Sequence, residues 1–374
     1  MRRERTQNAL FVAAAIALIA WLSCNLSSNL ASRGVTIDYG FLWDATSFPI
    51  GESVISFSSG DTYFRAFLAG LLNTIKLAAA AIVLSTILGG LIGLAGRAGH
   101  PQVKALARAY VEVTRNIPLL LILVVCATAV RALPSPRQAW VAWDTFFLSS
   151  RGLYLPLVRF GDAGASLAIC TVLLALVAAF TWRSMLRGRN ESGGFSHSAT
   201  FGFTATALGL LGLGIFASTV GIVERPSLTG FNFRGGVSLT PEYMAMLFGL
   251  AFYTSGFIAE IVRGSLAALP RGQSEAAWSL GLGPFMTLYL VLAPQALRLI
   301  LPPLANQYLN AIKNTTLAVL IGYPDLVSVG NTALNQTGRA IETVSIYLLI
   351  YLSLSLLTSV VIRWLEKRAQ LVKS

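Results

Sequence analysis

Long apolar runs recur along the whole chain, and they restrict its possible folds more than any other feature. A helix crosses the hydrocarbon of a bilayer with about 20 mainly apolar residues. Charged residues make up only 12% of the chain, about half of their share in soluble domains. The sequence therefore predicts an all-α polytopic membrane protein with about eight transmembrane helices. The expected spans are residues 9–26, 66–95, 105–130, 164–182, 199–221, 241–262, 298–322 and 343–363.

The distribution of Lys and Arg sets the expected orientation, because cytoplasmic loops carry an excess of both. With the N-terminus inside, most of the 28 Lys and Arg fall on inner segments, including the basic start MRRERTQNA. Such a start is also typical of a signal peptide, but Trp21 suits a cleavage site poorly, so we expect an uncleaved anchor helix. The net charge of +12 is then explained by membrane edges and not by nucleic acid. Both termini are predicted to be cytoplasmic.

One stretch between two apolar runs, from Arg271 to Pro294, begins with loop chemistry. Ser274 is a good helix N-cap, and Glu275 would follow in the first turn, where the helix dipole favours a carboxylate. Gly281 and Pro284 would end the helix. The spacing predicts a short helix with small residues on its surface, held in a loop between two membrane spans.

This stretch resembles the EAA loop of binding-protein-dependent ABC importer permeases. The family pattern is Glu-Ala-Ala, three residues, Gly, nine residues, an aliphatic, one residue and Leu-Pro; here Ala293 stands where Leu is usual. The resemblance implies a coupling helix that docks into a groove on a separate ATPase subunit. The alternative to a coupling helix is an amphipathic surface loop that contains a capped helix and binds no partner. The residues expected to couple to the ATPase are Gly272, Ser274, Glu275, Ala276, Ala277, Leu280, Gly281 and Pro294.

The resemblance also divides the chain. The five-helix core of type-I amino-acid permeases matches 66–130 and 241–363, and the chain is similar in length and span number to permeases of general L-amino-acid importers. We expect an N-terminal anchor and periplasmic segment, a permease domain, an insert with two extra helices, and a cytoplasmic tail. Their ranges are 1–63, 64–363, about 131–240 within the permease domain, and 364–374.

The predicted outer loop at 131–163 is rich in aromatic residues. An amphipathic helix lying in the membrane interface is the simplest interpretation of this composition. Its aromatic residues are Trp140, Trp143, Phe146 and Phe147.

Ionisable residues inside a span are functional candidates, because charge is costly in the bilayer. The run Lys313, Asn314, Thr315 and Thr316 resembles the Lys-x-Thr/Ser-Ser/Thr-Leu signature of amino-acid permeases, with Asn314 where Asp is common. Lys313 could hold a substrate carboxylate or pair with an acidic neighbour. The alternative is a purely structural role, in which these residues bond one helix to another.

A second polar element lies in the predicted span 105–130. Arg115, Asn116 and Pro118 resemble the family's Arg-x-x-Pro-Leu-Leu element, and Pro118 is expected to kink the helix. The element could shape a gate or a site, or Arg115 could simply pair with Glu112 at the kink. Asn73 is a further candidate for the substrate pathway.

Two other pairs have structural interpretations. Glu260 and Arg263 are spaced i,i+3 at the end of a span, where an ion pair would stiffen the link to the coupling loop. Gly89 and Gly93 form a GxxxG pair, which predicts close helix packing.

Signatures of catalysis are absent from the sequence. There is no G-x-x-x-x-G-K-[ST] phosphate loop, no G-x-S-x-G, H-E-x-x-H or C-x-x-C, and no metal-ligand spacing. We therefore expect no enzyme activity, metal or cofactor in this chain; ATP and Mg would bind the partner ATPase.

The resemblance implies a permease subunit of an ATP-driven importer in the bacterial inner membrane. It would receive amino acids, in a broad L-amino-acid range, from a periplasmic binding protein. Its expected partners are ABC ATPase subunits and a second, homologous but distinct, permease subunit. The alternative function is a self-contained secondary transporter or channel for small polar solutes. That class needs inverted repeats with broken helices and coupling-ion carboxylates, which the sequence does not clearly show.

Overall fold

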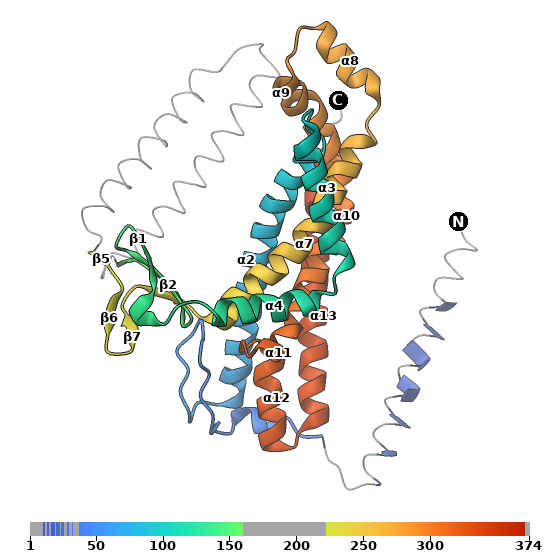
Figure 1. The fold of residues 1–374 in the computed structure, drawn as a ribbon. Helices are drawn as coiled ribbons and strands as arrows, with labels where there is room; N and C mark the ends of the chain where they lie inside the picture. Colours follow the sequence, from blue (N-terminus) through green and yellow to red (C-terminus); the bar gives the residue numbers. More distant parts are fainter. Residues whose placement is uncertain are drawn as a thin grey trace, which may run out of the picture. The chain divides into compact units, whose positions relative to one another are not determined.

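The computed structural model describes residues 37–159 and 222–370, with scattered positions between 10 and 32 that are helical. The expected spans 164–182 and 199–221 lie outside the described residues. The chain divides into two compact units, Met1–Ile122 with Met246–Ser374, and Leu123–Ala245. Each unit is described by itself below (Figure 1).

The first unit is helical. Short 3-10 elements and one π-helix, η4, interrupt or join its longer α-helices. In chain order they are η1 (Gly40–Trp43), α2 (Tyr63–Ala95), α3 (Pro101–Asn116), the start of α4 (Leu119–Arg131), α7 (Pro241–Ala267), α8 (Arg271–Ser279), α9 (Pro284–Met286), η4 (Thr287–Leu292), α10 (Ala293–Asn314), η5 (Thr315–Leu317), α11 (Ala318–Ile321), α12 (Leu326–Thr337) and α13 (Ala340–Gln370).

Four helical segments of the described residues are long and apolar enough to cross a membrane. They cover the predicted spans 66–95, 241–262, 298–322 and 343–363, so the prediction of a mainly helical, polytopic membrane protein is confirmed. The total of eight spans stays a prediction. The segments are Tyr63–Ala95, Pro241–Ala267, Pro284–Ile321 and Ala340–Trp364.

The predicted span 105–130 is two helices, α3 and α4, bent by 105° at the break between them. Ile117 has extended backbone angles (φ −94°, ψ 130°), as expected for a residue that precedes proline. Pro118 has no N–H to continue the hydrogen bonds of α3. The expected kink at Pro118 is therefore present, and it is a full break.

Helices α2 and α7 approach closely at Gly89 and Gly93. A Cβ atom at Gly89 would lie 2.7 Å from the Cβ of Ile258, and one at Gly93 would lie 2.7 Å from the carbonyl oxygen of Ala259. Both distances are too short for any side chain larger than hydrogen. The predicted GxxxG packing is confirmed, with α7 as the partner helix.

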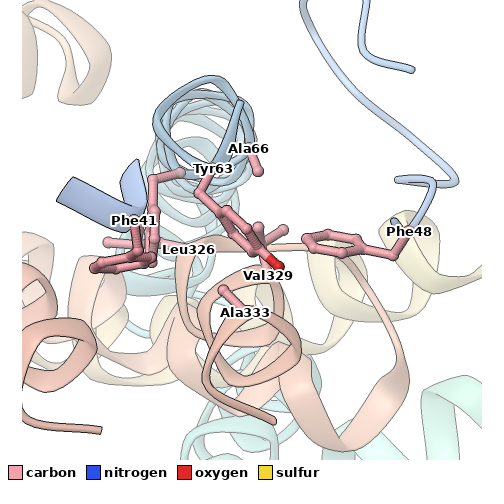
Figure 2. Close-up of a cluster of buried hydrophobic side chains, with 8 residues drawn as sticks. Phe41, Phe48, Tyr63, Ala66, Leu326, Val329 and Ala333 are labelled. Carbon is pink, nitrogen blue, oxygen red and sulfur yellow. The ribbon is translucent and has the colours of Figure 1, made fainter. Parts of the chain in front are cut away.

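The segment that precedes α2 folds back onto the helices. Phe41, Phe48 and Tyr63 pack with Leu326 and Val329 of α12 in a buried apolar cluster (Figure 2). The Tyr63 ring contacts both phenylalanine rings, with centroids 5.8 Å apart for Phe41 and Tyr63 and 6.2 Å for Phe48 and Tyr63. Because apolar burial drives folding at about 25 cal/mol per Å², this cluster fixes the segment on α2 and α12.

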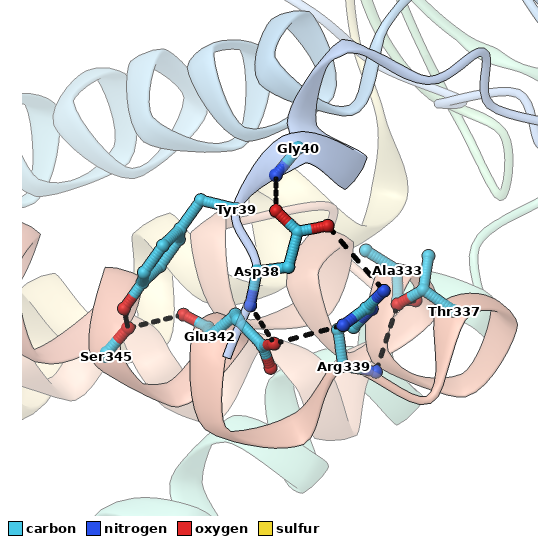
Figure 3. A network of polar contacts seen from close by, with 8 residues as sticks. All are labelled: Asp38, Tyr39, Gly40, Ala333, Thr337, Arg339, Glu342 and Ser345. Carbon is cyan, nitrogen blue, oxygen red and sulfur yellow. Dashed lines mark hydrogen bonds and ion pairs between the residues drawn. The ribbon is translucent and has the colours of Figure 1, made fainter. Parts of the chain in front are cut away.

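A polar network joins the same segment to α13 (Figure 3). The Arg339 guanidinium lies 3.8 Å from Asp38 Oδ2 and 3.5 Å from Glu342 Oε1. Glu342 Oε1 also accepts a hydrogen bond from the backbone N–H of Asp38 at 3.0 Å, and the hydroxyls of Tyr39 and Ser345 lie 2.8 Å apart. The start of α13 is thereby held to the residues that lead into α2.

The second unit contains most of α4 and small antiparallel sheets. One sheet has the order β1-β2-β3-β8, and two others pair β4 with β5 and β6 with β7. The elements are η2 (Pro136–Gln138), β1 (Trp140–Ala142), β2 (Phe146–Ser149), β3 (Gly152–Leu155), β4 (Leu157–Arg159), β5 (Ile222–Glu224), β6 (Ser227–Thr229), β7 (Asn232–Arg234) and β8 (Val237–Leu239).

The expectation of an amphipathic helix in 131–163 is therefore wrong. Trp140 lies in β1, Phe146 and Phe147 lie in β2, and Trp143 lies in the turn between the two strands with φ 51°. Aromatic residues favour strands when partners on neighbouring strands can pack against them. Such a partner exists for Phe147, which lies opposite Tyr154 of β3. The Phe147 ring also lies 4.5 Å from that of Phe233, which comes from β7 in another sheet.

Candidate functional site

The loop between α7 and α10 carries the helix that the sequence predicts, but α8 begins earlier than expected. Its first residue is Arg271, with Pro270 in the N-cap position. Ser274 lies one turn inside the helix, where its Oγ donates a hydrogen bond to the Arg271 carbonyl at 2.8 Å. The prediction of Ser274 as the N-cap is wrong, because Pro270, with φ −58°, already presents the backbone from which a helix can start.

The end of α8 is as predicted. The N–H of Gly281 donates to the Trp278 carbonyl at 2.9 Å, and the N–H of Leu282 donates to the Ala277 carbonyl at 3.1 Å. Gly281 has φ +77°, a left-handed conformation that only glycine adopts without strain. Gly281 therefore both ends α8 and sets the direction of the chain after it.

The surface of α8 and the residues that follow it is strongly apolar. Ala277 is buried, whereas Trp278 is 58% exposed and Leu280 is 81% exposed. Phe285 and Tyr289 stack with their rings nearly parallel, at an interplanar angle of 1°, and are also exposed. Large exposed apolar patches mark surfaces that contact a partner.

A side-chain hydrogen bond connects α8 to α10, and an ion pair stiffens the end of α7 before the loop. Gln295, next to Pro294 in the first turn of α10, donates a hydrogen bond from its Nε2 to Gln273 Oε1 of α8 at 2.9 Å. Near the end of α7, Arg263 Nε donates to Glu260 Oε2 at 2.9 Å and Arg263 Nη2 to Glu260 Oε1 at 2.6 Å. The predicted Glu260–Arg263 pair is thus present, and it lies at the point where α7 leads into the loop.

A cavity of about 420 Å³ opens beside this pair. Arg108, Glu112 and Arg115 of α3 line it together with Glu260 and Arg263. One alternative from the sequence was an ion pair between Arg115 and Glu112. Within the described residues, no such ion pair is present. The Arg115 guanidinium instead lies 5.7 Å from the ring centroid of Phe257, a distance at which a cation is attracted to an aromatic face.

The predicted pathway element Lys313–Thr316 lies where α10 ends. Lys313 is exposed and Asn314 is partly exposed. The Thr315 hydroxyl donates to the Ile312 carbonyl at 2.7 Å, and the Thr316 hydroxyl donates to the Lys313 carbonyl at 2.9 Å. Both threonines thus bond to their own helix, so neither hydroxyl proton is available to a ligand.

The helix is broken immediately after this element. The chain passes from α10 through η5 to the single turn of α11, and Gly322 then ends α11 with φ +93°. No hydrogen bond or ion pair between described residues joins Arg115 or the exposed Asn116 to Lys313–Thr316. In the part of the chain that the structure describes, the two predicted polar elements are therefore not bonded directly to each other.

Asn73, the remaining pathway candidate, is completely buried. Its Nδ2 donates to the carbonyls of Glu52 and Pro324, each at 2.8 Å, and its Oδ1 accepts from the N–H of Val54 at 3.2 Å. The next turn adds Lys76, whose Nζ lies 2.5 Å from Glu52 Oε1. Every polar atom of the Asn73 side chain is used to hold the segment before α2 and the residue Pro324, which leads into α12, against α2.

Asp325 is a buried polar residue that the sequence interpretation missed. Its Oδ1 accepts a hydrogen bond from the Ser328 N–H at 2.8 Å and so caps α12. Burial raises the pKa of Asp325 to about 6, although the backbone amides of Ser328 and Val327 oppose this shift. An Asp directly before an apolar run is a helix-start signal, which could have revealed both the residue and α12.

A family model and a solved structure each match part of this chain. The family model described as "Binding-protein-dependent transport system inner membrane component" matches residues 237–371, which include α7, the loop and α10 to α13. A solved structure titled "Crystal structure of an amino acid ABC transporter with histidines" is 22% identical, with a TM-score of 0.49 over 82% of this chain and 95% of that chain.

Three curated proteins match nearly the whole chain. The putative amino-acid ABC transporter permease protein YhdX of Escherichia coli (strain K12) is 41% identical over 97% of this chain and 93% of its own length. The general L-amino acid transport system permease protein AapQ of Rhizobium johnstonii is 40% identical over 96% of this chain and 90% of its own. The glutamate/glutamine/aspartate/asparagine transport system permease protein BztB of Rhodobacter capsulatus is 35% identical over 95% and 91%. This chain therefore belongs to the binding-protein-dependent transport system inner membrane components, among the amino-acid ABC transporter permeases.

Proposed function

We propose that the chain is the permease subunit of an importer that takes a broad range of L-amino acids from a periplasmic binding protein into the cytoplasm. The observation that carries this proposal is the identity of 40% to AapQ over 96% of the chain. AapQ is named as a general L-amino acid permease, and the match extends far beyond the residues of the family model. The names of YhdX and BztB also refer to amino acids.

The α8 surface is the proposed docking site for the ATPase. Its exposed Glu275 and Ala276 belong to the EAA pattern, and exposed Trp278 and Leu280 offer apolar area to a groove. ATP binding can shift the spans between two states only if the ATPase contacts α8 differently in each state. The hydrogen bond from Gln295 to Gln273 provides a connection through which α8 can move α10, and the Glu260–Arg263 pair stiffens the end of α7 that leads into α8.

Lys313 is the proposed contact for the substrate carboxylate. It is exposed at the end of α10, where the helix is broken, and within the described residues no carboxylate pairs with it. A free amino acid always carries a carboxylate, so one lysine can bind many side-chain types equally. This fits a broad substrate range.

The remaining partners are proposals as well. A second, homologous but distinct permease subunit would complete the translocation pathway, and the ATP and Mg would be held by the ATPase. In this arrangement the chain has no catalytic activity of its own and spans the bacterial inner membrane with both termini in the cytoplasm.

Reconstitution in proteoliposomes tests the proposal. The purified complex of this chain with its ATPase, binding protein and second permease should take up labelled glutamate, leucine and lysine only when ATP is enclosed. The chain alone should take up none. Uptake by the chain alone, driven by an ion gradient, would instead identify a secondary transporter, and uptake of a single amino acid would contradict the broad range.

A further inference from the structure

A second cavity, of about 360 Å³, lies beside the start of α8. Its walls come from the end of α2, the first half of α3, the end of α7 and the first turn of α8. We call it the basic cavity, because among the described residues five cationic side chains and no carboxylate line it. These are Arg97, Lys104, Arg108, Arg263 and Arg271.

Most of these cations have no anionic partner. Arg263 pairs with Glu260, but in the part of the chain that the structure describes, no ion pair involves the other four. Lys104 and Arg108 are spaced i,i+4 on α3, and like charges at that spacing destabilise a helix. Arg271 is the first residue of α8, where the helix dipole disfavours a positive charge. A bound anion would offset each of these unfavourable placements.

Part of the lining of the basic cavity is apolar. Leu266 lies in the last turn of α7, Leu269 follows that helix, and Leu292 is the last residue of η4. A small soluble anion would satisfy the cations but leave this part in contact with water. A molecule with both a phosphate and an acyl chain would fill both parts of the cavity.

The position of the basic cavity also suits a lipid. Arg97 directly follows the C-cap of the candidate span α2, and Arg263 lies in the last turns of the candidate span α7. The cations therefore lie where spans end, which is the depth of lipid headgroups. If α8 faces the cytoplasm, as the proposed function requires, these are headgroups of the inner leaflet, and basic pockets between spans on that side bind anionic lipids.

We infer that the basic cavity binds the phosphate of an anionic phospholipid of the inner leaflet, which contacts the first turn of α8. The lipid then becomes part of the connection between the coupling loop and the spans, because Lys104, Arg263 and Arg271 come from three different helices. This inference rests on the proposed orientation of the loop, but not on the identity of the substrate.

Native mass spectrometry of the assembled, delipidated complex tests the inference. The probes are phosphatidylglycerol, which is anionic, and phosphatidylethanolamine, which is zwitterionic. The variant Lys104→Gln/Arg108→Gln removes two cations from the basic cavity. Its matched control, Arg363→Gln/Lys367→Gln, removes two exposed cations of α13 that do not line it. We expect the wild type and the control to bind phosphatidylglycerol alike, and the cavity variant to bind it about 30-fold more weakly.

Three outcomes would overturn the inference. Equal binding by the cavity variant and the control would show that phosphatidylglycerol binds elsewhere. Displacement of phosphatidylglycerol by millimolar inorganic phosphate would identify a site for free phosphate. Crosslinking of a Lys104→Cys variant to the ATPase, together with no lipid binding by the wild-type complex, would assign the cavity to the ATPase interface. Lipid binding is read without turnover, so a failure of the proposed transport activity would leave this measurement interpretable.

Discussion

At the scale of single residues, Gly281 has the most specific requirement. Its φ of +77° is unfavourable for any other residue, yet a Cβ there would meet nothing within 4 Å. The strain of a substitution would come from the backbone alone, about 1–2 kcal/mol for an L-residue in the left-handed region. We expect Gly281→Ala to lower substrate-stimulated ATPase activity and uptake about 5- to 30-fold, and to leave membrane insertion unchanged.

Gly283→Ala is the control for this prediction. Gly283 also has open space around it, but its φ is −68°, which alanine adopts without strain. Both variants would be assayed in the assembled complex for ATP hydrolysis and uptake. Normal coupling by Gly281→Ala would contradict the proposed role of the loop.

Lys313 allows a second test at this scale. Loss of a hydrogen bond to a charged group costs about 1.5–3 kcal/mol, so Lys313→Ala should weaken uptake about 10- to 100-fold with normal copurification of the ATPase. Lys367→Ala, which removes an exposed cation of α13, should change neither. If Lys313→Ala instead prevents assembly, the lysine has a structural role.

Asp325 should make stability depend on pH. Its folded-state pKa of about 6 lies above the ordinary value of 3.8, so the folded chain holds the proton more tightly than the unfolded chain does. Its contribution to stability is therefore greatest below pH 4 and is lost as pH rises to about 6. Asparagine also caps helices, so Asp325→Asn should remove this loss, worth about 3 kcal/mol, and keep α12 intact.

The measurement for Asp325 is the apparent unfolding midpoint of the detergent-solubilised chain between pH 4 and pH 7. The wild type should lose stability relative to Asp325→Asn across this range. Asp144→Asn, in an exposed turn with φ 51° that asparagine tolerates, should keep the wild-type trend. Parallel curves for the wild type and Asp325→Asn would rule out the buried carboxyl as the source.

At the scale of elements, the contact of α2 with α7 depends on glycines, whose lack of a side chain lets the two helices approach closely. Gly93 faces the Ala259 carbonyl and Val262 within 2.7 Å of where a Cβ would stand, whereas Gly90 on the same helix has nothing within 4 Å. We expect Gly93→Ala to destabilise the chain by about 1–3 kcal/mol through overpacking. Gly90→Ala should be neutral or slightly stabilising, because alanine favours helix. Thermal unfolding in detergent compares them, and equal midpoints would contradict the close approach.

Elements with a local cause could be predicted from the sequence. The apolar runs predict α2, α7, α10 and α13 because each lies in a segment long and apolar enough to cross a bilayer. Gly281 and Pro118 determine the end of α8 and the break between α3 and α4 through backbone geometry. The strands could not be predicted, because the partner of β3 is β8, far along the chain. Composition alone cannot distinguish aromatic residues that face a neighbouring strand from those that face lipid.

The candidate site was predictable to a similar degree. The position of α8 followed from its motif, and the Glu260–Arg263 pair followed from helical spacing. The structural role of Asn73 could not be predicted, because its hydrogen-bond partners, the carbonyls of Glu52 and Pro324, are far from it in the sequence. From the sequence alone, Asn73 is a polar residue in a membrane span and so a candidate for the pathway. The sequence misplaces the start of α8, because it offers a side-chain cap at Ser274 whereas the helix begins after Pro270.

At the scale of the whole molecule, orientation is the property on which the proposed function depends. In a cysteine-free background, a Cys at exposed Ala276 should react with a membrane-impermeant maleimide only in inside-out vesicles. A Cys at Ser59, exposed in the segment before α2, should react only in right-side-out vesicles. Labelling of both from the same side would exclude a loop that meets a cytoplasmic ATPase.

The pairing of β3 with β8 has a consequence for biosynthesis. During translation β1, β2 and β3 leave the ribosome first, while Leu239, the partner of Leu153, is added only after the polypeptide between them has been made. Until then β3 presents an unpaired edge, which other chains can join. A nascent chain that stops before residue 237 would therefore keep this edge exposed, whereas one that includes β8 would cover it.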